Sequence, residues 1–163
     1  MDFTNLAAQC SPHIALETIQ AVVHVESSFN PYAIGIVDGR LTRQPTNLLE
    51  AVATVRQLKK QGIKFSAGIG QIYYQNWPKL GLNDTSVFDP CANLKAAQTI
   101  LSGCYARALA KSPAGEQQQA LRQAISCYYS NNFITGFQAG YVQKVVDSAG
   151  KFAGNKPASP PAQ

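Results

Sequence analysis

Apolar residues recur at helical spacing in several separate stretches of this chain. The first apolar stripe consists of Ala15, Ile19, Val22 and Val23. Residues spaced in this way share one face of a helix. Ser11-Pro12 predicts where this helix begins, because serine caps helix N-termini and proline favours the first helical position. The helix is expected to end before Asn30-Pro31, since the residue that precedes a proline is driven out of the helical region.

Four further helices are predicted by the same kind of pattern. One begins near Asn47, with Glu50 placed as a capping-box partner, and ends at Gly62. Another begins at Asp89-Pro90, which combines a capping residue with a proline at the first helical position. The last two are expected over residues 116–128 and 138–149, and the second of these places Tyr141, Val142, Val145 and Val146 inward.

The segment between the second and third predicted helices is expected to be irregular. Residues 63–86 contain three glycines and one proline, and they predict at most a short helix over residues 71–77. No alternating apolar and polar run predicts a strand, so the fold class is all-α with little or no strand. We expect one domain over residues 1–150. The Pro-rich composition of residues 151–163 predicts a flexible C-terminal tail.

Composition excludes several classes of protein. Of the 163 residues, 45% are hydrophobic, which is too many for a disordered chain. No stretch approaches the roughly 18 consecutive apolar residues of a membrane span. The net charge is +5, but the basic residues are dispersed and lack interleaved aromatic residues. We therefore expect no nucleic-acid partner.

The four cysteines are Cys10, Cys91, Cys104 and Cys127, and none of them forms a CxxC pair. Zinc-ribbon and thioredoxin-like sites are therefore unsupported. Free thiols are expected in a cytosolic protein, whereas one or two disulfides are expected in an oxidising compartment. The spacing does not choose among the three full pairings. No signal peptide is recognisable, so the chain is either cytosolic or a mature form with an added Met.

Glu26 is a carboxylate on an apolar helix face. At about 100° per residue it falls on the stripe that begins at Ala15. Burial and the negative end of the helix dipole both favour the protonated form, so we expect a raised pKa. A carboxyl group that holds its proton near neutral pH can act as a general acid. A structural alternative is that Glu26 pairs with a buried arginine or reaches solvent.

A metal-dependent alternative combines His24-Val25-Glu26 with Pro90-Cys91. This combination is similar to the zinc deaminase signature, but Leu94 stands where the second thiolate is required. We therefore expect no metal site.

Three sequence runs resemble motifs of the soluble lytic transglycosylases, which cleave bacterial peptidoglycan. The first, similar to E-S-x-x-N-P-x-A, is Glu26-Ser27-Ser28-Phe29-Asn30-Pro31-Tyr32-Ala33. The second, similar to G-L-x-Q-I, is Gly68-Ile69-Gly70-Gln71-Ile72. The third, Cys127-Tyr128-Tyr129-Ser130-Asn131, stands where that family has A-Y-N-x-G. Together with Phe88-Asp89-Pro90-Cys91, these runs resemble the lytic transglycosylase component of type IV secretion and conjugation systems.

The resemblance implies a lysozyme-like helical domain and an enzyme with a single catalytic carboxylate. Glu26 would serve as acid and then as base, and the product would carry a 1,6-anhydro-N-acetylmuramic acid end. Gln71 and Tyr128 would position the sugar or the carboxylate, with Ser27 and Tyr73 as further substrate-binding residues. The resemblance implies no cofactor. Its implied partners are peptidoglycan glycan strands and other type IV secretion components, in the periplasm.

Three positions depart from the family motifs. Tyr129 replaces an asparagine, Asn131 replaces a glycine, and Tyr73 stands where the larger family often has asparagine. Two alternatives stay open, and these departures motivate the first of them. One is a catalytically weak glycan-binding assembly factor of a secretion apparatus, and the other is a lysozyme-like hydrolase.

Overall fold

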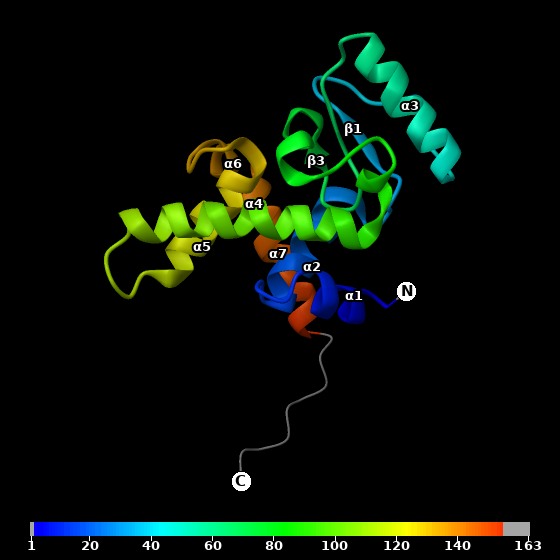
Figure 1. Cartoon of the computed structure of the whole chain (residues 1–163). Helices are drawn as coiled ribbons and strands as arrows, with labels where there is room; N and C mark the ends of the chain where they lie inside the picture. Colours follow the sequence, from blue (N-terminus) through cyan, green and yellow to red (C-terminus); the bar gives the residue numbers. More distant parts are fainter. Residues whose placement is uncertain (1, 155–163) are drawn as a thin grey trace.

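A computed structural model describes residues 2–154 of the chain. Figure 1 shows a mostly helical molecule with one long helix, α4 (Pro90–Lys111), crossing its middle. Helices α1 (Phe3–Cys10), α2 (Leu16–Ser27) and α7 (Tyr141–Gly154) lie on one side of α4. Helix α3 (Leu48–Lys60) and the strands lie near one end of α4, and α5 (Gln117–Ser130) and α6 (Thr135–Gln138) lie near the other. The predicted fold class is confirmed.

The N-terminal region differs from the prediction. Helix α1 was not predicted, and Ser11-Pro12 does not begin α2, which starts at Leu16 without a side-chain cap. Ser11 instead follows the end of α1, where its backbone N–H donates to the carbonyl of Ala7. Proline is also common just after a helix C-terminus, because it cannot continue the helix, so the same pair of residues can mark either end. The predicted end of α2 before Asn30 is confirmed.

Two helix starts were predicted correctly from their capping residues. Asn47 Oδ1 accepts from the backbone N–H of Glu50 at 2.9 Å, and α3 begins at the next residue after Asn47. Asp89 Oδ2 accepts from the backbone N–H of Ala92 at 2.8 Å, and α4 begins at Pro90. Each side chain satisfies an N–H group that has no partner within the helix.

The segment predicted to be irregular contains two strands of a small antiparallel sheet, and the remaining strand lies earlier, between the first and second predicted helices. The strands of this sheet are β1 (Ile34–Ile36), β2 (Phe65–Ala67) and β3 (Ile72–Tyr73), in that order across the sheet. Ile34 pairs with Ala67, and Ser66 pairs with Tyr73. The strands have only two or three residues each, which is too short for an alternating pattern to show. Three short 3-10 helices follow: η1 (Tyr74–Asn76), η2 (Pro78–Leu80) and η3 (Ser86–Phe88).

The C-terminal helix α7 packs along α2. Its residues Tyr141, Val142 and Val145 are buried, as the apolar stripe predicts. The helix continues to Gly154, so it is longer than predicted and includes residues 151–154 of the expected tail. The rest of that expected tail, residues 155–163, lies outside the described residues.

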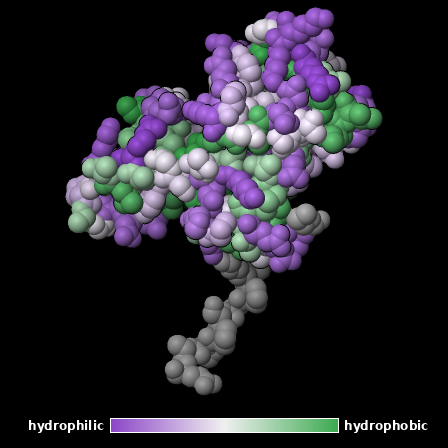
Figure 2. Space-filling view, in the orientation of Figure 1, coloured by the Kyte–Doolittle hydropathy of each residue, from purple (hydrophilic) through white to green (hydrophobic). Residues whose placement is uncertain are grey.

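The molecular surface mixes hydrophilic and hydrophobic side chains. On the face shown in Figure 2, hydrophilic side chains gather over the region of α3, and hydrophobic ones form small patches between them. Large exposed apolar residues are spread over several elements, among them Leu49 on α3, Leu109 on α4 and Ile134 before α6. Apolar residues that are exposed singly are normal on a protein surface, so this spread does not mark one docking face.

Two disulfides join the helices to α4. Cys10 pairs with Cys91, which ties α1 to the first turn of α4, and Cys104 pairs with Cys127, which ties α4 to α5. These pairs settle the connectivity that the cysteine spacing left open. Within residues 2–154, none of the helices combines the length and the apolar character that crossing a membrane requires.

Removing either disulfide is expected to lower the free energy of unfolding. The Cys10–Cys91 pair spans 81 residues and the Cys104–Cys127 pair spans 23. Loop-closure entropy predicts losses of about 4 and about 3 kcal/mol, respectively. Urea denaturation of the two double Cys→Ala variants measures both losses. A smaller loss from the pair with the wider spacing would contradict the entropic explanation.

Candidate active site

Glu26 lies in the last turn of α2, where the chain turns sharply away. Ser28 and Phe29 follow with φ angles of 51° and 65°, in the left-handed region that non-glycine residues rarely adopt. The helix therefore ends immediately after the turn that carries the carboxylate. The Phe29 ring makes an edge-to-face contact with Phe3, with ring centroids 5.1 Å apart.

The Glu26 side chain combines partial exposure with a desolvated carboxyl group. The residue keeps some accessible surface, yet burial of its carboxyl raises the pKa from 4.5 to about 7. None of the ion pairs within residues 2–154 includes Glu26. The structural alternative of a buried arginine partner is therefore wrong. At neutral pH the group is about half protonated, which suits transfer of a proton in either direction.

Two tyrosines lie close to the Glu26 carboxyl. Burial and the Glu26 charge raise the pKa of both Tyr128 and Tyr141 well above 10. Tyr141 also lowers the pKa of Glu26 through its hydroxyl group, although burial has the larger effect. The Tyr141 hydroxyl makes no hydrogen bond of ordinary geometry to the described residues, despite being buried. It therefore lies beside the carboxyl with spare hydrogen-bonding capacity.

Tyr141 was predicted only as an inward-facing core residue. The signal for a further role was its hydroxyl, because a tyrosine on a buried stripe needs a polar partner. Sequence periodicity alone does not identify that partner, because it comes from α2, near the other end of the chain.

Three predicted site residues hydrogen-bond the backbone of residues 68–71, here called the 68–71 loop. Ser27 Oγ donates to the carbonyl at position 69 at 2.8 Å, and the Tyr128 hydroxyl donates to that at position 70 at 2.6 Å. Gln71 Nε2 donates to the carbonyl at position 68 and to that of Ala33, both at 2.9 Å. Ser27 and Tyr128 therefore hold the loop against α2 and α5, and Gln71 joins it to Ala33, next to β1.

Asn93 holds the same loop from α4, and sequence reasoning missed it. Its side chain is completely buried; its Oδ1 accepts from the Gly70 N–H at 2.8 Å. Its Nδ2 donates to the carbonyls of Ala67 and Val87, at 3.1 and 2.8 Å. Gly68 has a φ of 84°, and a Cβ there would lie 1.9 Å from Asn93 Nδ2. The glycine is required both for its conformation and for the space that it leaves.

Gln71 and Tyr73 occupy the part of the loop that leads into β3. Gln71 has a φ of 53°, and its Oε1 accepts no hydrogen bond from residues 2–154. A Cβ at Gly35 would lie 2.7 Å from this oxygen. Tyr73 is half-buried and contacts Tyr74 edge to face. No hydrogen bond or charge interaction joins Tyr73 to Glu26 in the described part of the chain, so the structure does not bring these two together directly.

The departures from the third motif have structural explanations. Asn131 ends α5 with a φ of 61°, and asparagine tolerates this left-handed conformation better than most residues other than glycine. Arg107 Nη1 donates to Asn131 Oδ1 at 3.1 Å and fixes this turn. Tyr129 stacks on Tyr141, with ring centroids 4.6 Å apart and 19° between the ring planes.

The residues of the zinc alternative are not brought together. His24 Nδ1 lies 2.8 Å from Ser148 Oγ, and Cys91 is disulfide-bonded. Within the described residues, no group of three or more His, Cys, Asp or Glu side chains could hold a metal ion. The deaminase-like combination therefore has no structural counterpart here.

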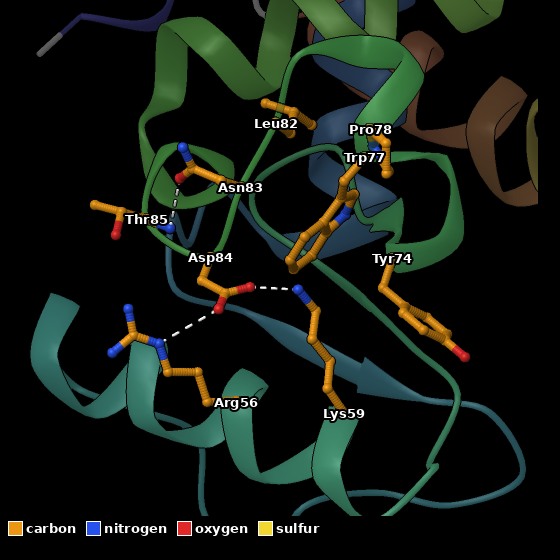
Figure 3. A pocket seen from close by; sticks show the side chains of 9 residues that line it. All are labelled: Arg56, Lys59, Tyr74, Trp77, Pro78, Leu82, Asn83, Asp84 and Thr85. Atoms are coloured by element: carbon orange, nitrogen blue, oxygen red, sulfur yellow. Dashed lines mark hydrogen bonds and ion pairs between the residues drawn. The ribbon is translucent and has the colours of Figure 1, made fainter.

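A separate cavity of about 490 Å³ lies between α3 and the segment that follows β3 (Figure 3). Asp84 forms ion pairs there with Arg56 and Lys59, and the Lys59 ammonium lies over the Trp77 ring. Glu26 is not among the residues that line this cavity. We interpret these ion pairs as the attachment of α3 to the rest of the sheet region.

Comparison with known proteins identifies a family over most of the chain. The profile described as "Transglycosylase SLT domain" matches residues 3–146. "Type IV secretion system protein virB1" of Brucella abortus is 52% identical over 152 residues, covering 90% of this chain and 63% of that protein. "Protein virB1" of Agrobacterium fabrum is 33% identical over 148 residues, covering 91% of this chain and 59% of that protein. The chain thus spans less than two thirds of the length of these relatives. No solved structure matches it significantly.

Glu26→Gln is expected to stabilise the protein at high pH. A carboxyl whose folded pKa is about 7 and whose unfolded pKa is 4.5 binds its proton more tightly in the folded state. The stability of the native protein should therefore fall as pH rises from 4.5 to 7, by up to about 3 kcal/mol. Urea denaturation at pH 4 should show similar stability for the unmodified protein and the Glu26→Gln variant. At pH 8 the variant should be the more stable, and equal stability there would contradict a desolvated carboxylate.

Tyr141→Phe is expected to raise the pKa of Glu26 above 7. The Tyr141 hydroxyl stabilises the charged carboxylate, so its removal favours the protonated form. Carbon-13 NMR titration of the Glu26 carboxyl measures the pKa directly. Tyr105→Phe, in α4, is a matched control that should leave this pKa unchanged. An unchanged or lowered value in the Tyr141 variant would show that the hydroxyl does not act on the carboxylate.

Proposed function

The chain belongs to the transglycosylase SLT domain family, and we propose that it cleaves peptidoglycan glycan strands as a lytic transglycosylase. The observation that carries this proposal is a desolvated Glu26 that has no carboxylate partner among residues 2–154. Its pKa is shifted by burial and by Tyr141, and no second acid contributes to the shift. Ordinary glycosidases use two carboxylates, one as acid and one as base or nucleophile. A transglycosylase needs one, because the substrate supplies the attacking hydroxyl.

In the first step, Glu26 donates its proton to the glycosidic oxygen between N-acetylmuramic acid and N-acetylglucosamine. The bond from C1 of the muramic acid to this oxygen breaks, and the N-acetylglucosamine leaves with a neutral 4-hydroxyl. The positive charge left at C1 is stabilised by the carbonyl oxygen of the substrate's own N-acetyl group. A pKa of about 7 leaves enough protonated Glu26 at neutral pH for this step.

In the second step, the Glu26 carboxylate takes the proton from the 6-hydroxyl of the muramic acid. The freed oxygen bonds to C1 and closes the 1,6-anhydro ring, while the N-acetyl oxygen is released. Glu26 ends the cycle protonated, so no water is consumed. Tyr141 supports this exchange because its hydroxyl stabilises the carboxylate that exists between the two steps.

The roles of the other site residues follow from their partners. The hydroxyls of Ser27 and Tyr128 donate hydrogen bonds to the 68–71 loop, so we assign these two residues the role of holding the loop beside Glu26. The Gln71 amide nitrogen donates to two backbone carbonyls, and its Oε1 is left available to accept a hydrogen bond from a sugar hydroxyl or amide. Tyr73 remains a predicted sugar contact.

The named relatives support a cellular context for this activity. Proteins called virB1 in Brucella and Agrobacterium match 90% or more of this chain's length, and the Brucella proteins carry the words "type IV secretion system". We propose that this chain opens the cell wall locally for such an apparatus. Two disulfides fit an oxidising compartment, and the periplasm is the compartment in which peptidoglycan lies.

Digestion of purified peptidoglycan tests the proposal. Mass spectrometry of the released muropeptides should show ends that lack the mass of one water. Glu26→Gln should lower the rate by a factor of about 10² to 10⁴, because the amide can neither donate nor accept the proton. In the unmodified enzyme, the rate should fall as pH rises above 7, since the general acid loses its proton.

Glu116→Gln is the matched control, because Glu116 is exposed at the start of α5 and its removal should leave the rate unchanged. Reducing ends in the products would contradict transglycosylation and favour a lysozyme-like hydrolase. Binding to peptidoglycan without any cleavage by the unmodified protein would favour the glycan-binding assembly factor.

A further inference from the structure

Tyr129 is an exposed aromatic residue attached directly to the candidate active site. It lies near the end of α5, one residue after Tyr128, and 50% of its surface is accessible. Its ring is stacked on Tyr141, with 4.6 Å between the ring centroids. Tyr141 is itself buried beside the Glu26 carboxyl. A continuous path of two stacked rings therefore leads from the carboxyl to the molecular surface.

The stack holds Tyr129 in a defined orientation. One face of its ring is covered by Tyr141, and the two planes are within 19° of parallel. Half of the side chain remains in contact with solvent, although burying it would be favourable. An aromatic ring that is fixed on one side and open on the other is already organised for a ligand, so little conformational entropy is lost on binding.

We propose that the open part of the Tyr129 ring is a stacking platform for a pyranose ring of the glycan strand, beside the sugar whose bond is broken. This inference rests on the proposed function and extends it to a specific contact. One face of an N-acetylhexosamine ring carries axial C–H groups, which pack favourably against the negative face of an aromatic ring. We assign a sugar to this position because Tyr129 is joined to Glu26 through Tyr141. A glycan strand that is bound across the carboxyl also extends over the residues next to it.

The sequence departure at this position supports a change in how the sugar is held. The related motif has asparagine here, and an asparagine side chain offers hydrogen bonds but no apolar face. Tyr129 offers an apolar face and keeps a hydroxyl at its tip. Packing against Tyr141 does not by itself explain why Tyr129 is half exposed, because a wholly buried side chain could support Tyr141 in the same way.

Binding of a hexamer of N-acetylglucosamine, measured by calorimetry, tests the platform. All variants carry Glu26→Gln, so that no bond is broken during the measurement. Tyr129→Leu keeps a side chain against Tyr141 but removes the aromatic face, and it should weaken binding roughly fivefold, which equals about 1 kcal/mol. Tyr129→Phe keeps the face and should bind within about twofold of the parent. Leu49→Ala, at an exposed position on α3, is the matched surface control.

Saturation-transfer NMR with the same hexamer separates direct contact from support of Tyr141. The C–H protons of the sugar should receive magnetisation when the aromatic protons of the Tyr129→Phe variant are irradiated, and this transfer should be weaker in the Tyr129→Leu variant, in which only the remaining aromatic contacts, such as that predicted for Tyr73, can contribute. Equal affinity of these two variants, or equal transfer in both, would overturn the platform.

The outcome is distinguishable from that of the proposed function. Cleavage of peptidoglycan by the unmodified enzyme tests the function and does not depend on Tyr129. If the unmodified enzyme releases anhydro products while the Tyr129→Leu variant binds the hexamer normally, only the platform is wrong. If the unmodified enzyme does not cleave peptidoglycan, the proposed function fails first and the platform fails with it.

Discussion

The buried backbone of the 68–71 loop is the constraint on which the site depends. Buried N–H and carbonyl groups must find partners, because each group left unpaired costs free energy. Asn93, in the first turn of α4, accepts from the Gly70 N–H and donates to the carbonyls of Ala67, just before the loop, and Val87 in η3. Gly68 leaves the space in which the Asn93 amide fits. Ser27 from α2 and Tyr128 from α5 complete the pairing. The loop thus joins three helices that are distant in the sequence.

The same convergence of helices explains the state of Glu26. When α2, α5 and α7 are drawn around the loop, the carboxyl loses most of its water and gains two tyrosines as neighbours. None of the described ion pairs brings a cation to it, so desolvation outweighs the stabilising effect of the Tyr141 hydroxyl and the pKa rises to about 7. The chemistry of the site therefore follows from packing around a loop rather than from a charged partner.

Sequence reasoning succeeded where the determining interaction is local and failed where it is distant. The caps at Asn47 and Asp89 act within three residues, and the position of Glu26 on its helix stripe depends only on helical spacing. The sheet was missed because its strands are too short to show alternation. The polar roles of Asn93 and Tyr141 were missed because the groups they act on lie on other elements. The apolar stripe placed Tyr141 in the core without showing its neighbour Glu26, and no sequence pattern pointed to Asn93.

A single carboxylate that acts first as acid and then as base needs a pKa near the working pH, and burial without a counter-charge achieves this at a cost in stability. An arginine beside Glu26 would recover that stability but would lower the pKa and remove the proton donor. The fold instead gains stability elsewhere. Both disulfides involve α4, the helix that also carries Asn93, so the element that fixes the 68–71 loop is itself covalently tied to α1 and α5. The disulfides therefore offset the stability that is lost by leaving the Glu26 carboxylate unpaired, and they do so without contacting its charge.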